Sequence, residues 1–313
     1  MVKYNDKNAP LLKINNMTVT FTQYDRGLKK TELPVIRDLA VEVRPGETVA
    51  VIGSSGSGKS LLAHAVMGVL PYNAEMKADM TYDGEPLDKK RIEMLRGNEM
   101  VMVPQSLSFL NPLMKIGPQI KKGRNDNETN KRLNNIFEQF ELDKKVMNMY
   151  PFELSGGMNR RVLVSTALIE HPRLVIADEP TPGLDPAMAK RAMSHFRDMA
   201  NNGAAVLVIT HDLELALETA DRVSVFYSGT TIEDASVKDF EKEEYLRHPY
   251  TKALWRAMPR NGFKFISGNQ SYVKNLPKGC VFSPRCPFKT EECELTQEYR
   301  SLRSGKVRCV NAK

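Results

Sequence analysis

The chain has 313 residues, enough for one large domain and a small appendage, and its 41% hydrophobic and 27% charged residues are typical of a globular protein. It contains no run of 18 apolar residues that would predict a membrane-spanning helix. Its first seven residues, Met-Val-Lys-Tyr-Asn-Asp-Lys, lack the apolar stretch of a secretory signal, so we expect the protein in the cytoplasm.

The net charge of +7 comes from the last quarter of the chain. Residues 241–313 carry 15 Lys and Arg against 7 Asp and Glu, whereas residues 1–240 carry 30 and 31. A solvated basic face explains this excess, and so does attraction to anionic lipid or to nucleic acid. An anionic cluster held inside the tail is a further explanation.

Three apolar runs predict buried parallel strands, at Thr48–Ile52, Leu174–Ala177 and Ala205–Ile209. Each run leads directly to residues with useful chemistry, which are Gly53, Asp178 and Thr210-His211. Because ligands of open α/β sheets bind at the carboxyl ends of the strands, we expect a site there.

Other elements flank these strands. Met17–Phe21 and Leu39–Val43 are rich in strand-forming residues, and the polar stretch Thr22–Leu33 between them predicts a loop. The segment 105–169 is predicted to be mostly helical, and Asn130–Glu141 has its apolar residues at helical spacing.

A domain boundary is predicted near residue 240, which divides the chain into residues 1–240 and 241–313. Before it, Val223–Ile232 predicts two short strands around Ser228-Gly229. Beyond it, His248–Met258 predicts a short helix, and Pro259–Lys278 has the composition of a linker.

A phosphate-binding loop is predicted where Gly-Ser-Ser-Gly-Ser-Gly-Lys-Ser stands between a strand and a helix running from Lys59 to about Val69. Its glycines let backbone N–H groups surround phosphates, and the helix adds its positive N-terminal end. Lys59 is expected to reach the β- and γ-phosphates, and the Ser60 hydroxyl to hold Mg²⁺. The expected nucleotide contacts here are Gly53, Ser54, Ser55, Gly56, Ser57, Gly58, Lys59, Ser60 and Leu61.

Two further motifs complete a nucleotide-hydrolysing set. Asp178 ends a hydrophobic strand and suits Mg²⁺, and Glu179 is placed to orient or deprotonate an attacking water. Ser155 caps a predicted helix that opens with Gly156 and Gly157, although glycines weaken helices unless a ligand must approach the backbone. Two phosphate-binding devices in one chain predict a dimer that holds ATP between its subunits.

In this order the motifs resemble the nucleotide-binding subunit of an ATP-binding-cassette (ABC) transporter, over about residues 11–240. The resemblance implies an α/β P-loop NTPase fold: a RecA-like core, an antiparallel β subdomain and a helical subdomain at about 105–169, with a small cysteine-containing C-terminal extension. The matching positions are Gly53–Ser60, Gln105, Leu154–Met158, Leu174–Glu179, Pro182–Asp185 and His211.

The resemblance also implies roles. Two subunits close head to tail, so that the signature residues Ser155, Gly156 and Gly157 contact ATP bound by the partner. The implied catalytic residues are Glu179, His211 and Gln105, the implied Mg²⁺ ligands are Ser60, Gln105 and Asp178, and Asp185 joins the nucleotide contacts. Phe21 is the first choice for the ring that stacks on adenine and Tyr24 the second, although a core aromatic explains Phe21 almost as well.

Two positions depart from the family pattern. Arg160 stands where the family usually has Gln shortly after the signature, and Pro182-Gly183 begins a loop that commonly reads Ser-Ala-Leu-Asp. Because Asp185 is kept, hydrolysis is still expected. The proline stiffens the loop, which is a reason to expect unequal sites in a dimer.

Several segments resemble one branch of this family, the importers of oligopeptides, dipeptides and nickel. They are Met158, Phe109–Pro112 with Ile116-Gly117, His248–Leu254 and the tail from Leu276 to Pro287. Such importers pair two different ATPase subunits with two membrane permeases and an external binding protein, at the cytoplasmic face of the membrane. Peptide is favoured over nickel or a metal chelate as cargo.

All four cysteines, Cys280, Cys286, Cys293 and Cys309, lie in the last 34 residues. In a cytosolic protein such a group points to metal or redox chemistry rather than disulfides. Their spacing matches neither a zinc finger nor a ferredoxin run. The branch resemblance implies a [4Fe–4S] cluster, whose negative charge Arg285, Lys289, Lys306 and Arg308 would offset; zinc and metal-free packed thiols are the alternatives.

Other functions of the same cassette fit less well. Nucleic-acid ATPases of this type carry coiled coils or zinc modules within the cassette, or two cassettes in one chain, so no nucleic-acid partner is expected. Exporters often fuse the cassette to membrane helices. A non-hydrolysing regulatory subunit is disfavoured because Glu179 is present.

Overall fold

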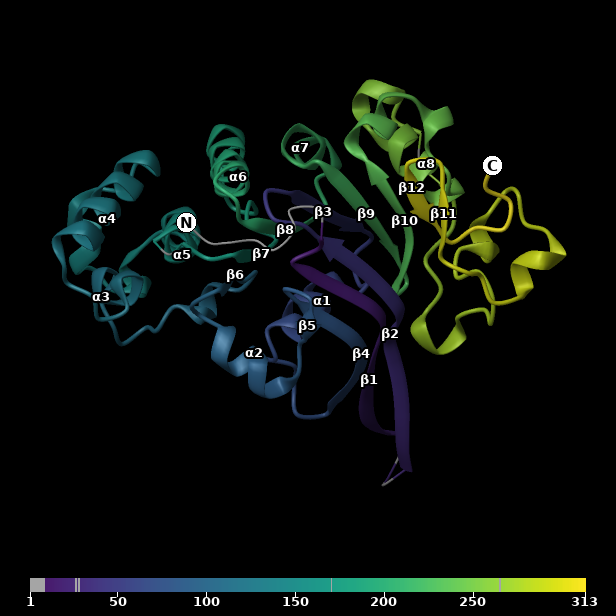
Figure 1. Cartoon of the computed structure of the whole chain (residues 1–313), viewed down its shortest axis with the longest axis horizontal. Helices are drawn as coiled ribbons and strands as arrows, with labels where there is room; N and C mark the ends of the chain where they lie inside the picture. The colour runs from purple at the N-terminus through teal and green to yellow at the C-terminus, as the bar shows by residue number, and fades with distance from the viewer. Residues whose placement is uncertain (1–8, 26, 28, 170, 265) are drawn as a thin grey trace.

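The computed structural model describes residues 9–25, 27, 29–169, 171–264 and 266–313. Its centre is an eight-stranded sheet in the order β11-β12-β10-β9-β3-β8-β7-β6 (Figure 1). The strands are β3 (Thr48–Gly53), β6 (Met100–Val103), β7 (Leu174–Asp178), β8 (Ala205–Thr210), β9 (Arg222–Tyr227), β10 (Thr230–Ser236), β11 (Arg300–Leu302) and β12 (Gly305–Val307). Those from β9 to β6 are parallel, which confirms the three predicted parallel strands.

The parallel strands are buried on both faces, which explains their continuous apolar sequences. In β7, Val175 and Ala177 belong to a core cluster shared with helices α5 (Gly156–Leu168) and α6 (Pro186–Asn201). The alternate residues Leu174 and Ile176 belong to a second cluster, shared with α1 (Lys59–Val66). With helices packed on both faces, the strand ends are the part of the sheet that can form a site.

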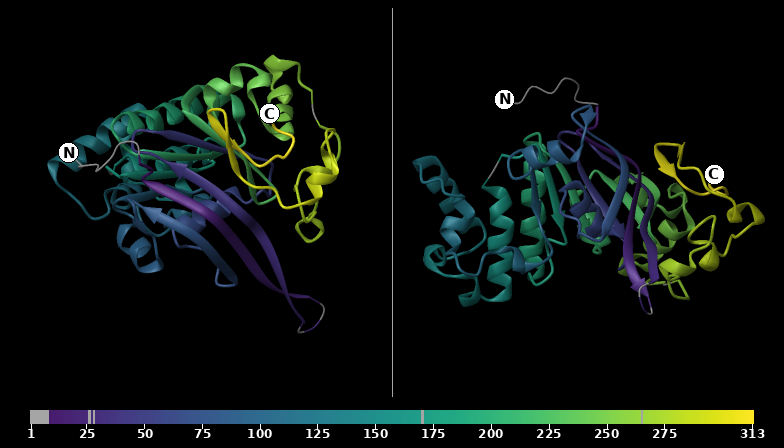
Figure 2. Two further views of the ribbon diagram at one scale, coloured as in Figure 1. Left: turned by 45° about the vertical axis from the view of Figure 1, so that its right-hand side comes forward. Right: turned by 90° about the horizontal axis from the view of Figure 1, so that it is seen from below.

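A second sheet is antiparallel, in the order β2-β1-β4-β5. Its strands are β1 (Leu12–Asp25), β2 (Lys29–Val43), β4 (Ala74–Tyr82) and β5 (Glu85–Pro86). The predicted loop at Thr22–Leu33 is wrong, because β1 and β2 extend through most of it, with Thr22 opposite Glu32. The far end of this hairpin projects from the body of the molecule (Figure 2). Because the far end of the hairpin does not pack on a hydrophobic core, its side chains are polar, and its composition is like that of a loop.

The segment that follows β6 is mostly helical, as predicted. It contains α3 (Ile116–Lys121), α4 (Asn127–Gln139) and α5, while α2 (Lys89–Leu95) precedes β6. Helix α4 begins earlier than predicted because the Asp126 carboxylate caps it by accepting a hydrogen bond from the Thr129 N–H. These helices lie at the β6 end of the large sheet (Figure 1).

The C-terminal part of the chain returns to the large sheet. After α7 (Leu213–Thr219), the predicted strand pair appears as β9 and β10, and the predicted helix as α8 (Pro249–Ala257). Short 3₁₀ turns then lead to β11 and β12, and β12 pairs with β10. In the described ranges, no helix combines the length and the apolar character needed to cross a membrane.

Candidate functional site

The strand order brings the predicted chemical residues to one edge of the sheet. Strands β3, β8, β7 and β6 are consecutive neighbours, and all run in the same direction. Their carboxyl ends therefore lie side by side: Gly53 is the last residue of β3, and His211, Glu179 and Gln105 come after the ends of β8, β7 and β6. Gly53 and His211 are more than 150 positions apart in the sequence, and only the topology of the sheet brings them to the same edge.

The loop between β3 and α1 has room only for glycine at its start. A Cβ atom on Gly53 would lie 2.4 Å from the carbonyl oxygen of Phe226 in β9. Gly58 caps α1 in the left-handed region, with φ of 91°, where glycine has no steric penalty. The helix begins at Lys59, as predicted, and ends at Val66. The backbone thus adopts the curl that a phosphate cradle requires.

The Lys59 side chain folds back onto this loop. Its Nζ donates hydrogen bonds to the carbonyl oxygens of Gly53, at 2.8 Å, and Ser54, at 3.0 Å. Burial lowers the pKa of the Lys59 ammonium, and the charges of Glu179 and Asp178 act in the opposite direction. A buried cation held above a ring of backbone groups is suited to bind a phosphate.

Asp178 and Ser60 form the oxygen pair expected for Mg²⁺. The Ser60 hydroxyl donates to Oδ1 of Asp178 at 3.0 Å. The other carboxylate oxygen, Oδ2, is buried and has no hydrogen-bond partner among the described residues. Burial is the main cause that raises the pKa of Asp178. An orphaned buried oxygen beside a hydroxyl fits a hard cation that binds oxygen ligands.

Glu179 and His211 meet across the ends of β7 and β8. Glu179 has a left-handed φ of 47°, and its N–H donates to the carbonyl of Ile209 at 2.9 Å. Its Oε2 lies 2.8 Å from Nδ1 of His211. The Glu179 side chain is only 8% exposed, whereas that of His211 is 70% exposed. A positive φ in a non-glycine residue is costly, and here it turns the carboxylate toward the histidine.

Gln105 lies just beyond β6 with its side chain exposed. Its backbone is held from α5, because Nη2 of Arg160 donates to the Gln105 carbonyl at 2.7 Å. The predicted contact of the Gln105 side chain with Mg²⁺ stays a prediction. The sequence marked Arg160 only as a departure from a family pattern, and its position in the site was missed.

The signature residues lie at the start of helix α5. Ser155 caps α5 by accepting a hydrogen bond from the Met158 N–H at 3.3 Å, as predicted. Ser155 and Gly156 are exposed, and a Cβ on Gly157 would come within 3.3 Å of the Gly183 carbonyl. Helix α5 packs against β6, whereas α1 packs against β3 and β7. The two phosphate-binding motifs of one chain therefore stand on separate elements.

Asp185 caps a helix, and the two aromatic residues that are candidates for adenine stacking differ in exposure. The Asp185 carboxylate caps α6, accepting a hydrogen bond from the Met188 N–H at 3.0 Å. Phe21 is half-buried in β1 and packs against the core, while Tyr24 is 69% exposed. The ring of Tyr24 is thus the more accessible of the two.

The C-terminal segment reaches the phosphate-binding loop, which sequence reasoning missed. The Ser54 hydroxyl donates a hydrogen bond to the side-chain oxygen of Gln270. Burial raises the pKa of Tyr250 in α8, and its interaction with Ser54 partly offsets this effect. A single tyrosine or glutamine in a tail carries no motif, so no local signal could have shown these contacts.

Family comparisons agree with this geometry. Residues 36–182 match the ABC transporter family, and residues 232–293 match the C-terminal region of oligopeptide/dipeptide transporters. The oligopeptide transport ATP-binding protein OppD of Salmonella typhimurium is 33% identical over 95% of this chain and 92% of its own length. The oligopeptide transport ATP-binding protein AppD of Bacillus subtilis is 34% identical over 96% of both chains. The chain belongs to this family of ABC transporter ATPases.

Solved structures show the same fold. A dimeric bacterial ABC transporter cassette superposes with a TM-score of 0.60, at 26% identity, over 72% of this chain and 98% of that one. An ATP-binding subunit of an ABC transporter gives a TM-score of 0.61 at 23% identity, over 74% and 92%. The resemblance to ABC ATPases and the expected α/β P-loop fold are confirmed, and this ABC ATPase binds ATP with Mg²⁺.

The four cysteines of this ABC ATPase are free thiols. Burial together with the other three thiols raises the pKa of Cys280 to about 11, and burial with Cys286 and Cys293 raises that of Cys309. In the part of the chain that the structure describes, no three His, Cys, Asp or Glu side chains are arranged to hold a metal ion. The expected iron–sulfur or zinc ligation is therefore not shown.

The basic residues of the tail have other partners in the structure, and their predicted role in offsetting the charge of a cluster stays a prediction. Lys289 pairs with Glu294, Lys306 with Glu42 and Arg308 with Asp38. Arg285 donates instead to the Tyr227 hydroxyl and to two backbone carbonyls. These cations mostly attach the tail to the cassette, because their carboxylate partners lie in other elements.

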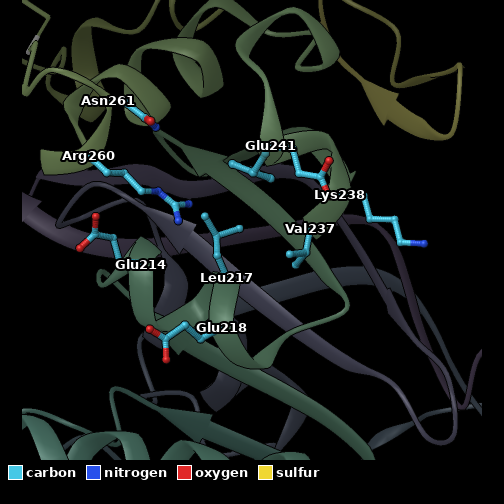
Figure 3. A pocket seen from close by; sticks show the side chains of 9 residues that line it. Glu214, Leu217, Glu218, Val237, Lys238, Glu241, Arg260 and Asn261 are labelled. Atoms are coloured by element: carbon cyan, nitrogen blue, oxygen red, sulfur yellow. The ribbon is translucent and has the colours of Figure 1, made fainter.

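A separate surface pocket of about 640 Å³ lies between α7 and the start of the C-terminal segment (Figure 3). Three carboxylates and two cations line it, together with apolar side chains; the charged residues are Glu214, Glu218, Glu241, Lys238 and Arg260. The excess of carboxylates repels a triphosphate, and none of the residues predicted to bind the nucleotide lines this pocket.

Proposed function

We propose that this ABC ATPase powers the import of peptides across the cytoplasmic membrane. The observation that carries the proposal is the Lys59, Ser60–Asp178 and Glu179–His211 arrangement at one sheet edge. It stands in a chain that matches oligopeptide and dipeptide transport ATP-binding proteins over nearly its whole length. The names of these relatives support peptide as cargo and give the nickel alternative no support.

Each residue of the site has a separate proposed role in ATP hydrolysis. Ser60, Asp178 and Gln105 would hold Mg²⁺, and the cation would neutralise phosphate charge. Glu179 would orient the attacking water and accept its proton, and His211 would fix Glu179 and contact the γ-phosphate. Lys59 and the loop backbone, from Gly53 to Leu61, would bind the phosphates. Phe21 or Tyr24 would stack on adenine.

Two subunits would complete each site. Exposed Ser155 and Gly156, with Gly157, would contact the ATP bound by the partner, and Asp185 would line the same interface. The dimeric form of a structurally similar cassette supports this arrangement. The partner would be a second ATPase subunit, with a different chain favoured. The pair would sit peripherally at the cytoplasmic face beneath two permease subunits, and an external binding protein would deliver the peptide.

Peptide uptake tests the proposal. In cells that lack other peptide importers, the chain with its partner subunits should accumulate a labelled tripeptide, and Glu179→Gln should abolish uptake while leaving ATP bound. Gln keeps the shape of Glu but cannot accept a proton, so turnover should fall at least 100-fold. Uptake of nickel in place of peptide, or full turnover by the variant, would contradict the proposal.

We also propose that the four cysteines ligate a [4Fe–4S] cluster, with zinc as the second choice. Cys286, Cys293 and Cys309 each act with burial to raise the pKa of Cys280, which supports a common site for the four thiols. Four thiolates are the usual ligands of such clusters. Protein purified without oxygen should contain about four irons per chain and a broad visible band, both lost in Cys280→Ser. One zinc per chain would support the second choice. If the protein contains neither iron nor zinc, the thiols are packing residues.

A further inference from the structure

Arg160 connects the signature helix to the loop that carries Gln105. It lies in the second turn of α5, four residues after Gly156, and is buried. Its Nη1 donates to the carbonyl oxygen of Pro104 at 3.1 Å, and its Nη2 donates to that of Gln105 at 2.7 Å. The planar guanidinium thus spans two consecutive peptide groups, which fixes both their position and their orientation.

The surroundings of Arg160 belong to the hydrolytic site. Asp178 and Glu179 are the two carboxylates that attract its charge. Its Nε is buried and has no hydrogen-bond partner among the residues that the structure describes. A guanidinium remains charged at any pH a protein experiences, so this cation is permanent. It is offset by two backbone carbonyls and by the carboxylates at the end of β7.

We propose that Arg160 is a positioning residue that fixes the Gln105 loop to the signature helix, so that both move as one unit relative to Asp178 and Glu179. This inference rests on the proposed function of that site. A glutamine, the usual family residue here, has one amide group with two donor hydrogens and a shorter side chain. Arginine makes the connection bidentate and charged, and therefore stiffer.

The expected consequence is specific to catalysis. The phosphate contacts come from Gly53–Ser60, which Arg160 does not touch, so loss of the connection should leave the KM for ATP within twofold. The misplaced Gln105 loop should lower kcat by about tenfold to 100-fold, as small displacements in active sites do. It should also raise the Mg²⁺ concentration needed for half-maximal rate.

The chain offers a matched control in the next residue. Arg161 also donates to two backbone carbonyls, those of Phe140 at 2.8 Å and Glu141 at 3.3 Å, within the helical segment. Arg160→Gln and Arg161→Gln therefore each shorten an arginine that bridges two carbonyls, but only the first affects the Gln105 loop. We expect Arg160→Lys, which keeps the charge and one donor group, to recover part of the lost kcat.

A double-mutant cycle tests whether Arg160 acts through the loop. If it does, Arg160→Gln should lower kcat much less in a Gln105→Ala background than in the wild type, because the two changes remove one coupled unit. Equal fold-losses in both backgrounds would overturn the proposal. So would a loss of kcat in Arg161→Gln as large as that in Arg160→Gln.

Hydrogen exchange tests the connection without turnover. In nucleotide-free protein, Arg160→Gln should speed amide exchange in the segment 101–110 by about tenfold, whereas Arg161→Gln should leave it unchanged. Unchanged exchange in Arg160→Gln would contradict the positioning role even if the protein hydrolyses ATP. Faster exchange in a protein without ATPase activity would support the connection and instead contradict the proposed function.

Discussion

Nδ1 of His211 lies 2.8 Å from Oε2 of Glu179, and this contact joins a mostly exposed ring to a buried carboxylate. With Glu179 ionised, Nδ1 carries the proton and donates it to the hydrogen bond. The unusual backbone of Glu179, with φ of 47°, fixes the carboxylate from one side and the histidine fixes it from the other.

His211→Ala should lower the rate of ATP hydrolysis by about 100-fold, because Glu179 loses the group that orients it. ATP binding should remain, since Lys59 and the loop backbone are unaffected. Steady-state hydrolysis and nucleotide titration measure the two effects separately. His171→Ala, at an exposed position outside the site, is the control. Turnover within twofold of the wild type in His211→Ala would show that the contact is not needed.

Gly53→Ala should destabilise the protein by about 1–3 kcal/mol, because the new methyl group meets the Phe226 carbonyl within β9 and the structure must shift. Gly56→Ala is the comparison: nothing lies within 4 Å of its added Cβ, and only its φ of 75° is unfavourable, which costs about 1 kcal/mol. Urea unfolding of nucleotide-free protein measures both. An equal loss in the two variants would show that the steric argument is wrong.

Tyr250→Phe should raise the KM for ATP a few-fold with little change in kcat, because the buried hydroxyl interacts with Ser54 and so supports the phosphate loop from the C-terminal segment. Tyr272→Phe removes an exposed hydroxyl from the same segment and should have no effect. Kinetics with ATP as the varied substrate distinguish the two variants. An unchanged KM in Tyr250→Phe would mean that the segment does not influence the loop.

His248→Asn should make the protein less sensitive to acid. Burial lowers the pKa of the His248 imidazole to about 3, whereas an unfolded histidine titrates near 6.5. Between these values the unfolded chain binds the extra proton, so the wild type loses stability as the pH falls below about 6.5. Asn can still accept the hydrogen bond from the Tyr250 N–H that caps α8.

The difference between the two proteins isolates this effect. Buried Glu233 and Asp234, whose pKa values are raised, act with the opposite sign in both proteins and cancel in the comparison. The free energy of unfolding of His248→Asn relative to the wild type should therefore rise by about 1.4 kcal/mol per pH unit below pH 6.5. Parallel pH curves would show that His248 is not kept neutral by the fold.

Local motifs in the sequence determined the phosphate loop, the acidic strand end, the signature helix cap and the branch of the family. Each depends on a few adjacent residues whose backbone requirements are local: the left-handed Gly58, an apolar run before Asp178, and a capping Ser155. Such patterns can be interpreted without knowledge of the tertiary contacts that these residues make. They also placed the three parallel strands correctly.

Only the tertiary structure decided which of these residues meet. The order β3-β8-β7-β6 makes neighbours of distant strand ends. The hydrogen bonds from Arg160 to the Gln105 loop and from Ser54 to the C-terminal segment join residues 55 to more than 200 positions apart. No periodicity or spacing encodes such contacts, because they depend on the packing of whole elements. The same reason explains the error at Thr22–Leu33, where pairing between two strands outweighed a polar, loop-like composition.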